Sequence, residues 1–317
     1  MLTGILAGLA AGALWGMVFI APKAVLPFTE LDLAIGRYGA FALCSALLML
    51  HPRFRPGRIT WPLAAQALVL GMSGYVLYYL AAAYAVRWSG PAVPPLIIGA
   101  LPVILAIIGN WQERNVRWRA LALPLLLIGA GLFLVDIAAR AQAPTQAARD
   151  AILWGIIASF AALAIWIAYA LINARAMRAA HPPSSLAWTG LQGLGAGLAV
   201  LPLIPLAAFT GATSVGAVPL GSPEGLKFIA WCLALGAGAS WLATWFWSIA
   251  SKRLPLALSA QLIIAETLFG LSYGYLWEAR WPVPLEWAGA GLLILGVVIG
   301  VAVFSRAGEA GQQGHAG

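Results

Sequence analysis

The chain has 317 residues, of which 62% are hydrophobic and only 9% are charged, and its mean hydropathy is +0.90. A soluble globular protein carries about 25% charged residues, so the composition excludes an ordinary soluble enzyme or soluble binding domain. The net charge of +8 is spread over the short segments between apolar runs. This distribution argues against a surface that binds nucleic acid.

Ten apolar runs of about 20 residues follow one another, and each is long enough to cross a bilayer as a helix. The runs cover residues 4–26, 32–50, 62–86, 90–110, 119–137, 151–174, 186–209, 227–250, 256–277 and 284–304. They predict an all-α integral membrane protein with ten transmembrane helices. The polar stretches 138–150 and 305–317 predict a linker loop and a disordered cytoplasmic tail.

The first predicted helix repeats glycine at every fourth position, as Gly4, Gly8, Gly12 and Gly16. Small residues at this spacing let two helices approach closely in a membrane, so the stripe predicts a packing surface. The run lacks a basic n-region and exceeds an ordinary signal-peptide core, so we expect the helix to be retained. Trp15 lies beside this stripe and is a candidate for substrate binding.

The second and fourth predicted helices carry isolated features. Arg37 lies about six residues into the second helix, close enough to an interface to snorkel, and we expect a gating or structural charge there. It is also a candidate cation to pair with Glu266. In the fourth helix Pro102 is interior, frees a backbone carbonyl and predicts a bend. Glu113 lies near the end of that helix, where an anchoring role is expected.

The third, sixth and eighth predicted helices each carry aromatic residues that share a helical face. Several lie well inside their spans, where the polar atoms of Tyr and Trp need partners. Ordinary bundle packing is one explanation, and an aromatic substrate pocket is the other. With Trp15 and Glu266, the candidate substrate-binding residues are Tyr75, Tyr78, Tyr79, Trp166, Tyr169, Trp241 and Trp245.

Glu266 is the single acidic residue in the central half of any predicted span. A charge at the centre of a membrane helix costs roughly 3 kcal/mol on insertion scales. It shares a narrow arc with Gly270, Tyr273 and Trp277. A carboxyl there is either neutral because of desolvation or paired with a cation. It is thus a candidate to bind a substrate ammonium or couple a proton, with a structural hydrogen-bonding acid as the alternative.

Shifting the chain by 165 positions aligns residues 68–113 with 233–278 without a gap, and ten of the 46 positions are identical. Chance would give about four or five in this composition. Glu113 then faces Glu278, which also lies at a helix end. Trp15 and Trp166 likewise occupy similar places in the first helix of each half.

Halves of five helices, 1–137 and 151–304, must insert with opposite orientations. Such an inverted repeat is typical of secondary transporters, whose substrate site lies near the midplane. A duplication that merely enlarged a helix bundle is the alternative. With the N-terminus in the cytoplasm, eleven of the eighteen Lys and Arg residues fall on the cytoplasmic side. The positive-inside rule thus predicts a multi-pass protein of the inner (cytoplasmic) membrane with both termini cytoplasmic.

Several motifs resemble the drug/metabolite transporter (DMT) superfamily, in particular its EamA-type ten-helix members. They are "ALWGMVF", "LAIGRYGAFAL", "IIGALPVILAIIGNWQER", "AETLFGLSYGYLWEAR" and "WAGAGLLILGVVIG". The resemblance covers residues 4–304 and implies a transporter, often an exporter, similar to bacterial amino-acid and metabolite exporters. It would also let Glu113 and Glu278 act as gate contacts. The usual Glu-Pro pair of the second half is here Glu266-Thr267, which puts the helix bend at that site in doubt.

Motifs for other chemistry are missing from the sequence. His51, His181 and His315 are scattered over loops and the tail, and Cys44 and Cys232 lie inside spans. Neither metal-ligand spacing nor a phosphate-binding glycine loop occurs. We therefore expect no metal, no cofactor, no catalytic residues and no nucleic-acid partner. The expected partners are a small-molecule substrate and the lipid bilayer, for a monomer or homodimer.

These patterns predict a secondary transporter that exports small organic metabolites by alternating access around a central aromatic pocket. Amino acids, aromatic compounds or amines are the expected substrates, because aromatic faces attract ammonium groups. Export of cationic drugs is the alternative. A channel, a non-transporting membrane protein or a lipid enzyme is less well supported, since clustered catalytic residues do not occur within the spans.

Overall fold

A computed structural model describes residues 1–57, 59–113, 116–143, 145–177, 184–254 and 262–313. Every regular element within these ranges is helical, and none of them is a strand. Eight helical stretches are long and apolar enough to cross a membrane: Leu2–Phe19, Glu30–Leu48, Trp61–Ser89, Trp118–Gln142, Gln146–Met177, Ser185–Thr210, Pro223–Arg253 and Pro284–Phe304. The prediction of an all-α membrane protein is confirmed.

The elements follow the predicted runs. The first half contains α1 (Leu2–Gly16), η1 (Met17–Phe19), α2 (Ala21–Ala24), α3 (Glu30–Leu48), η2 (Pro52–Phe54), α4 (Trp61–Leu70), η3 (Gly71–Leu77), α5 (Tyr78–Ser89), α6 (Val93–Ile98), α7 (Leu101–Glu113), η4 (Trp118–Leu121) and α8 (Ala122–Gln142). The second contains α9 (Gln146–Met177), α10 (Ser185–Val200), α11 (Leu203–Thr210), α12 (Pro223–Leu233), η5 (Ala234–Leu242), α13 (Ala243–Arg253), α15 (Ile264–Trp277) and α16 (Pro284–Gln313).

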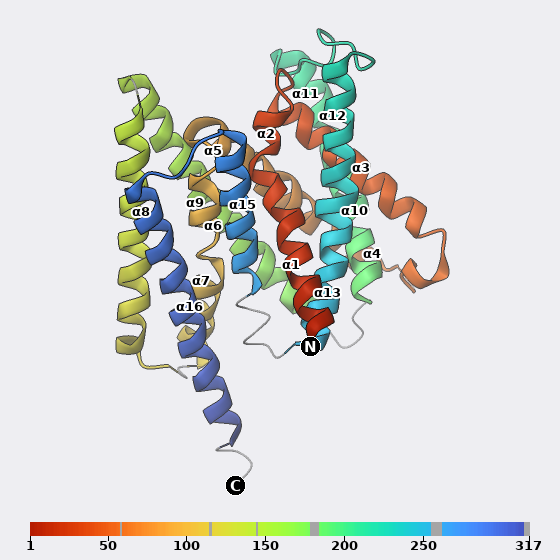
Figure 1. The fold of residues 1–317 in the computed structure, drawn as a ribbon. Helices are drawn as coiled ribbons and strands as arrows, with labels where there is room; N and C mark the ends of the chain where they lie inside the picture. Colours follow the sequence, from red (N-terminus) through yellow and green to blue (C-terminus); the bar gives the residue numbers. More distant parts are fainter. Residues whose placement is uncertain (58, 114–115, 144, 178–183, 255–261, 314–317) are drawn as a thin grey trace.

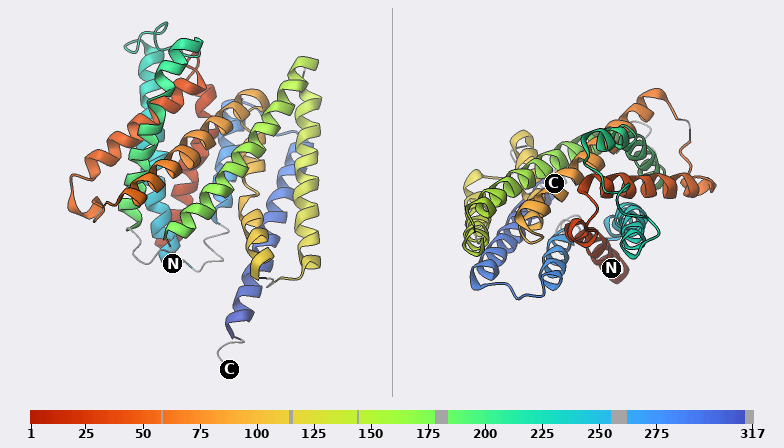
Figure 2. Two further views of the ribbon diagram at one scale, coloured as in Figure 1. Left: turned by 180° about the vertical axis from the view of Figure 1, so that it is seen from behind. Right: turned by 90° about the horizontal axis from the view of Figure 1, so that it is seen from above.

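The helices form a bundle with two distinct ends (Figure 1). The N-terminus of α1 and the C-terminal end of α16 lie at the same end, which we call the terminal end. The beginnings of α3, α9 and α16 and the ends of α5, α8 and α15 lie at the other end, which we call the distal end. Seen from above, α8 and α16 lie on one side of the bundle and α3 and α12 on the other (Figure 2).

Two of the long spans change from α-helix to π-helix at their centres. The π-helical segments are η3, between α4 and α5, and η5, between α12 and α13. Leu242, the last residue of η5, lies 165 positions after Leu77, the last residue of η3. π-Helical turns are rare and concentrate at functional sites. These two segments therefore indicate a candidate functional site at the centre of the bundle.

The fourth and ninth predicted spans are interrupted or short in the structure. Gly99 and Ala100 separate α6 from α7, directly before the dipeptide Leu101-Pro102. Proline has no backbone N–H, so Pro102 cannot donate to the carbonyl of Ile98, four residues earlier, and it is tolerated in the first turn of a new helix, which accounts for the break. The 14 residues of α15 begin at Ile264. Neither α6–α7 nor α15 is among the eight long spans, so the count of ten helices stays a prediction.

The glycine stripe of α1 packs as the sequence predicts. All four glycines are buried. A Cβ at Gly12 would lie 3.0 Å from the backbone nitrogen of Glu266, and one at Gly16 would lie 2.9 Å from that of Gly270. The stripe thus lets the backbones of α1 and α15 come close to each other, as small residues do in membrane helix pairs.

Two predicted segment boundaries are wrong. The expected loop at 138–150 is largely helical, because α8 continues to Gln142 and α9 begins at Gln146. An ion pair between Arg140 and Asp136, one turn apart, supports this end of α8. The expected disordered tail at 305–317 is also helical as far as Gln313.

Candidate functional site

A central cavity of about 350 Å³ lies between the two halves of the chain. Its aromatic wall comes from η3, α5 and α9. The ring centroids of Tyr78 and Trp166 lie 4.6 Å apart, and Trp166 stacks on Tyr169 at 5.0 Å. Tyr75 meets Tyr169 edge-on at 5.8 Å. These offset and edge-on contacts are the arrangements that aromatic rings favour, and they give the cavity one continuous aromatic side.

A second pair of rings closes the cavity from α1 and α13. The centroids of Trp15 and Trp247 lie 5.7 Å apart, and both residues line the cavity. Trp247 is absent from the residues expected from sequence, although it lies one helical turn after Thr244 and two turns after Ser240, which also line the cavity. Trp247 meets Trp15 because α1 packs against α13. Sequence periodicity does not reveal which helices pack together.

Six of the nine predicted substrate-binding residues line this cavity: Trp15, Tyr75, Tyr78, Trp166, Tyr169 and Glu266. The other three lie elsewhere. Tyr79 and Trp241 are buried behind the wall. Trp245 is 37% exposed and stacks on Phe246 on the outside of α13. The structure therefore does not place Trp241 and Trp245 on the cavity face that their spacing predicts.

A polar network borders the aromatic wall on α9. The Tyr169 hydroxyl donates to Oε1 of Gln192 at 2.9 Å. The side-chain oxygen of Asn173 accepts from Nε1 of Trp188 at 2.7 Å and from Nε2 of Gln192 at 3.4 Å. Asn173 lines the cavity, so its amide nitrogen is a polar group available to a solute there.

Glu266 is the acidic residue of the cavity. It is the third residue of α15 and is half-buried. Its carboxylate makes no hydrogen bond or ion pair with any other residue that the structure describes. The N-terminus of a helix carries a partial positive charge that stabilises an anion. Within the described residues, Glu266 is thus an acid that faces the cavity without a hydrogen-bond or ion-pair partner, and its charge interacts at longer range with that of Arg37.

Arg37 also lines the cavity, and its predicted role as a gating or structural charge stays a prediction. Its residue exposure is only 5%, so it does not snorkel to an interface. Its Nε and Nη2 atoms both donate to Oγ of Ser240 at 3.3 Å. The cavity is therefore lined by both an acidic side chain, that of Glu266, and a basic side chain, that of Arg37.

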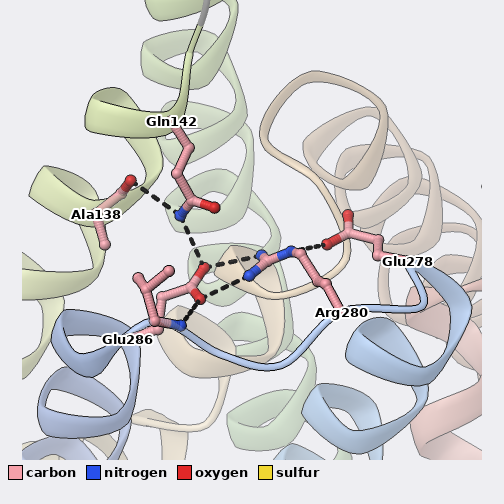
Figure 3. Close-up of polar contacts among 6 residues, drawn as sticks. Ala138, Gln142, Glu278, Arg280 and Glu286 are labelled. Carbon is pink, nitrogen blue, oxygen red and sulfur yellow. Dashed lines mark hydrogen bonds and ion pairs between the residues drawn. The ribbon is translucent and has the colours of Figure 1, made fainter.

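A charged cluster lies at the distal end of the bundle (Figure 3). Arg280 donates through Nη1 and Nη2 to the two carboxylate oxygens of Glu286, at 2.7 and 2.9 Å. Its Nε donates to Glu278 at 2.8 Å. Gln142 donates to Glu286 at 3.3 Å and to the carbonyl of Ala138 at 3.1 Å. The cluster joins the end of α8, the end of α15 and the start of α16.

All four ion pairs within the described ranges lie at this distal end. Besides the two pairs of Arg280 and the Arg140–Asp136 pair on α8, Arg87 at the end of α5 donates to Glu30 at the start of α3 at 2.7 Å. Glu278, predicted as a gating or structural charge, therefore belongs to an inter-helix cluster. Glu113, its counterpart in that prediction, ends α7, and its side chain lies outside what the structure describes.

Comparison with known proteins relates the chain to an inner membrane protein and to a solved structure. No family model matches the chain. The Inner membrane protein YtfF of Escherichia coli (strain K12) is 31% identical to it over 311 residues, which cover 95% of each chain. The chain belongs to the YtfF family. A protein of known crystal structure superposes with a TM-score of 0.61 at 19% identity, covering 96% of this chain and 98% of the other, and it shares the fold.

The relationship to YtfF agrees with the architecture. YtfF is an inner membrane protein, and this member of its family has eight helical stretches long and apolar enough to span a membrane. The family likeness extends over nearly the whole chain, so it includes both halves that line the cavity.

Proposed function

We propose that this member of the YtfF family is a secondary transporter that exports small organic metabolites across the cytoplasmic membrane by alternating access. Amino acids, aromatic compounds or amines are its substrates, and the central cavity is the binding site. The resemblance of the sequence to the EamA-type transporters of the DMT superfamily agrees with this proposal, as does a cavity of about 350 Å³, within the usual size range of small-molecule sites.

One observation carries the proposal: equivalent positions of the two halves line the same cavity. Four pairs of lining residues are separated by the 165 positions of the sequence repeat: Gly74 and Ala239, Tyr75 and Ser240, Ile98 and Ile263, Leu101 and Glu266. The π-helical segments η3 and η5 end in the same register, and Ile264, where α15 begins, lies 165 positions after the break at Gly99. A site between inverted repeats, built on interrupted helices, is the arrangement of secondary transporters.

The two ends of the bundle differ in a way that alternating access requires. All ion pairs among the described residues lie at the distal end. The cavity extends toward the terminal end, because its walls include Asn173 and Ala174, which lie near the end of α9. We take the terminal end to be cytoplasmic, on the positive-inside rule, so that the cavity faces the cytoplasm.

Counterflow in proteoliposomes tests the proposal. Purified full-length protein is reconstituted, loaded with an unlabelled compound and given trace amounts of the same compound in labelled form, across a panel of amino acids, aromatic compounds and amines. A transporter accumulates the labelled compound transiently without any imposed gradient, whereas protein-free liposomes do not. Absence of exchange across the whole panel would contradict the proposal. Exchange restricted to lipophilic cations would favour the drug exporter instead.

A further inference from the structure

The direct contacts of the Arg37 guanidinium with other described residues of the cavity wall are with neutral groups. Two of its nitrogens share the Ser240 hydroxyl, and its central carbon lies 4.5 Å from the ring centroid of Tyr79 and 5.1 Å from that of Tyr38. These contacts fix its orientation, because cation–π contacts favour a guanidinium over a ring face. None of them supplies a negative charge.

The hydrogen bonds of Arg37 are incomplete. No carboxylate of the described chain lies within 4.0 Å of its nitrogens. Among the residues that the structure describes, its Nη1 atom has no acceptor, and the hydroxyl of Tyr79, on the ring that the guanidinium covers, has no partner either. A guanidinium has five N–H donors, and a buried cation without an anion is strongly unfavourable. The site is therefore complete only when an anionic acceptor joins it.

Glu266 is the complementary half of this arrangement. It lines the same cavity from α15, whereas Arg37 lies on α3, and the two side chains do not form an ion pair. An amine bound at Glu266 would leave Arg37 without an anion, and a carboxylic acid bound at Arg37 would leave Glu266 without a cation. A solute with both charges satisfies both side chains at once.

We propose that Arg37 and Glu266 together select a zwitterion: Arg37 binds the carboxylate of an α-amino acid and Glu266 binds its ammonium group. The aromatic wall formed by Tyr78, Trp166 and Tyr169 then takes an apolar or aromatic side chain. The inference rests on the proposed function and narrows it, because it excludes simple amines, including cationic drugs, as preferred substrates.

Matched solutes that differ in one charge test this selection. L-Phenylalanine, 2-phenylethylamine and 3-phenylpropanoate share the ring and nearly the same chain, and leucine, 3-methylbutylamine and 4-methylpentanoate form an aliphatic set. Binding to purified full-length protein in nanodiscs is followed by tryptophan fluorescence, since Trp15, Trp166 and Trp247 line the cavity. In at least one set we expect the amino acid to bind about tenfold more tightly, or better, than either single-charge analogue.

Arg37→Gln separates recognition from folding. It should weaken amino-acid binding about tenfold or more while leaving the amine unaffected or bound more tightly, because an unpaired cation no longer opposes it. Arg37→Lys should keep part of the preference for the amino acid. Loss of a purely structural arginine would weaken both solutes together and leave their ratio unchanged, which would overturn the inference.

The affinities of the wild-type protein for each amino acid and its two single-charge analogues test the zwitterion selection even if the variants do not fold. An amine or a carboxylic acid that binds as tightly as its amino acid would overturn the zwitterion selection. If such an analogue also shows counterflow, the transporter stands and only the substrate class is wrong. If no solute of either set binds, the zwitterion selection is overturned. If no compound of the counterflow panel is exchanged either, the proposed function is overturned as well.

Discussion

At the scale of single residues, the cavity concentrates charge that the membrane would otherwise exclude. Glu266 and Arg37 face the same space, and each lacks an ionic partner within the described chain. Ionisable side chains inside a membrane are costly and mark pathways for substrates or protons. The two roles proposed for Glu266, binding of an ammonium group and coupling of a proton, are separable by experiment.

We expect Glu266→Gln to abolish proton-driven uptake into inverted vesicles, because an amide cannot exchange a proton. If Glu266 also binds the ammonium group, counterflow should fall about tenfold or more as well. Glu224→Gln is the matched control, since Glu224 is exposed at the start of α12. Normal proton-driven uptake and counterflow by Glu266→Gln would assign this acid a structural role.

At the scale of elements, α1 and α15 pack closely because the glycines of α1 place no side chain between the two backbones. Gly12 lies against the backbone of Glu266 and Gly16 against that of Gly270. The position of Glu266 in the cavity therefore depends on a contact made by residues that do not line it. Overpacking such a contact costs typically about 1–3 kcal/mol.

Gly16→Leu should lower the thermal stability of the purified protein and reduce counterflow, because the added side chain forces α15 away from α1. Gly129→Leu is the matched control, since a Cβ at Gly129, on the exposed face of α8, would meet no atom within 4 Å. Thermal unfolding of both variants by differential scanning fluorimetry checks the expectation. Equal melting temperatures for the two would contradict it.

At the scale of the whole molecule, the charged cluster lies at the distal end of the bundle, whereas the cavity lies at its centre. Arg280 connects the loop after α15 to the start of α16, and Glu286 connects that loop to α8 through Gln142. Glu286 is only 4% exposed, whereas the side chain of Arg280 is 31% exposed, so only the carboxylate side of the bidentate pair is shielded from water. Opening the distal end requires this cluster to separate or to move as a unit.

Arg280→Gln should therefore expose the cavity to the distal side. A cysteine at Ala170, which lines the cavity, in a chain with Cys44 and Cys232 replaced by Ser, should react faster with a membrane-impermeant thiol reagent added outside intact cells. Arg140→Gln is the matched control, because its ion pair with Asp136 lies within α8 and joins no two elements. Equal labelling of the two variants would rule out a closing role for Arg280.

The membrane class, the packing stripe of α1 and the acid of the cavity were predictable from the sequence. Each depends on local properties: the length of an apolar run, the spacing of glycines along one helix, and the cost of one carboxylate in lipid. The boundaries at 138–150 and 305–317 were wrong because polarity there marks the ends of long helices rather than loops.

Which residues line the cavity was decided only by the tertiary structure. Helical periodicity assigns residues to a face but does not say which neighbour that face meets. Trp241 and Trp245 share a helical face on sequence grounds, yet Trp247 lines the cavity instead. Arg37 reads as a charge near a helix end, and it reaches the cavity only because α3 packs against η5 and brings it to Ser240. Sequence thus determines which residues are costly in a membrane, whereas helix packing determines which of them face one another.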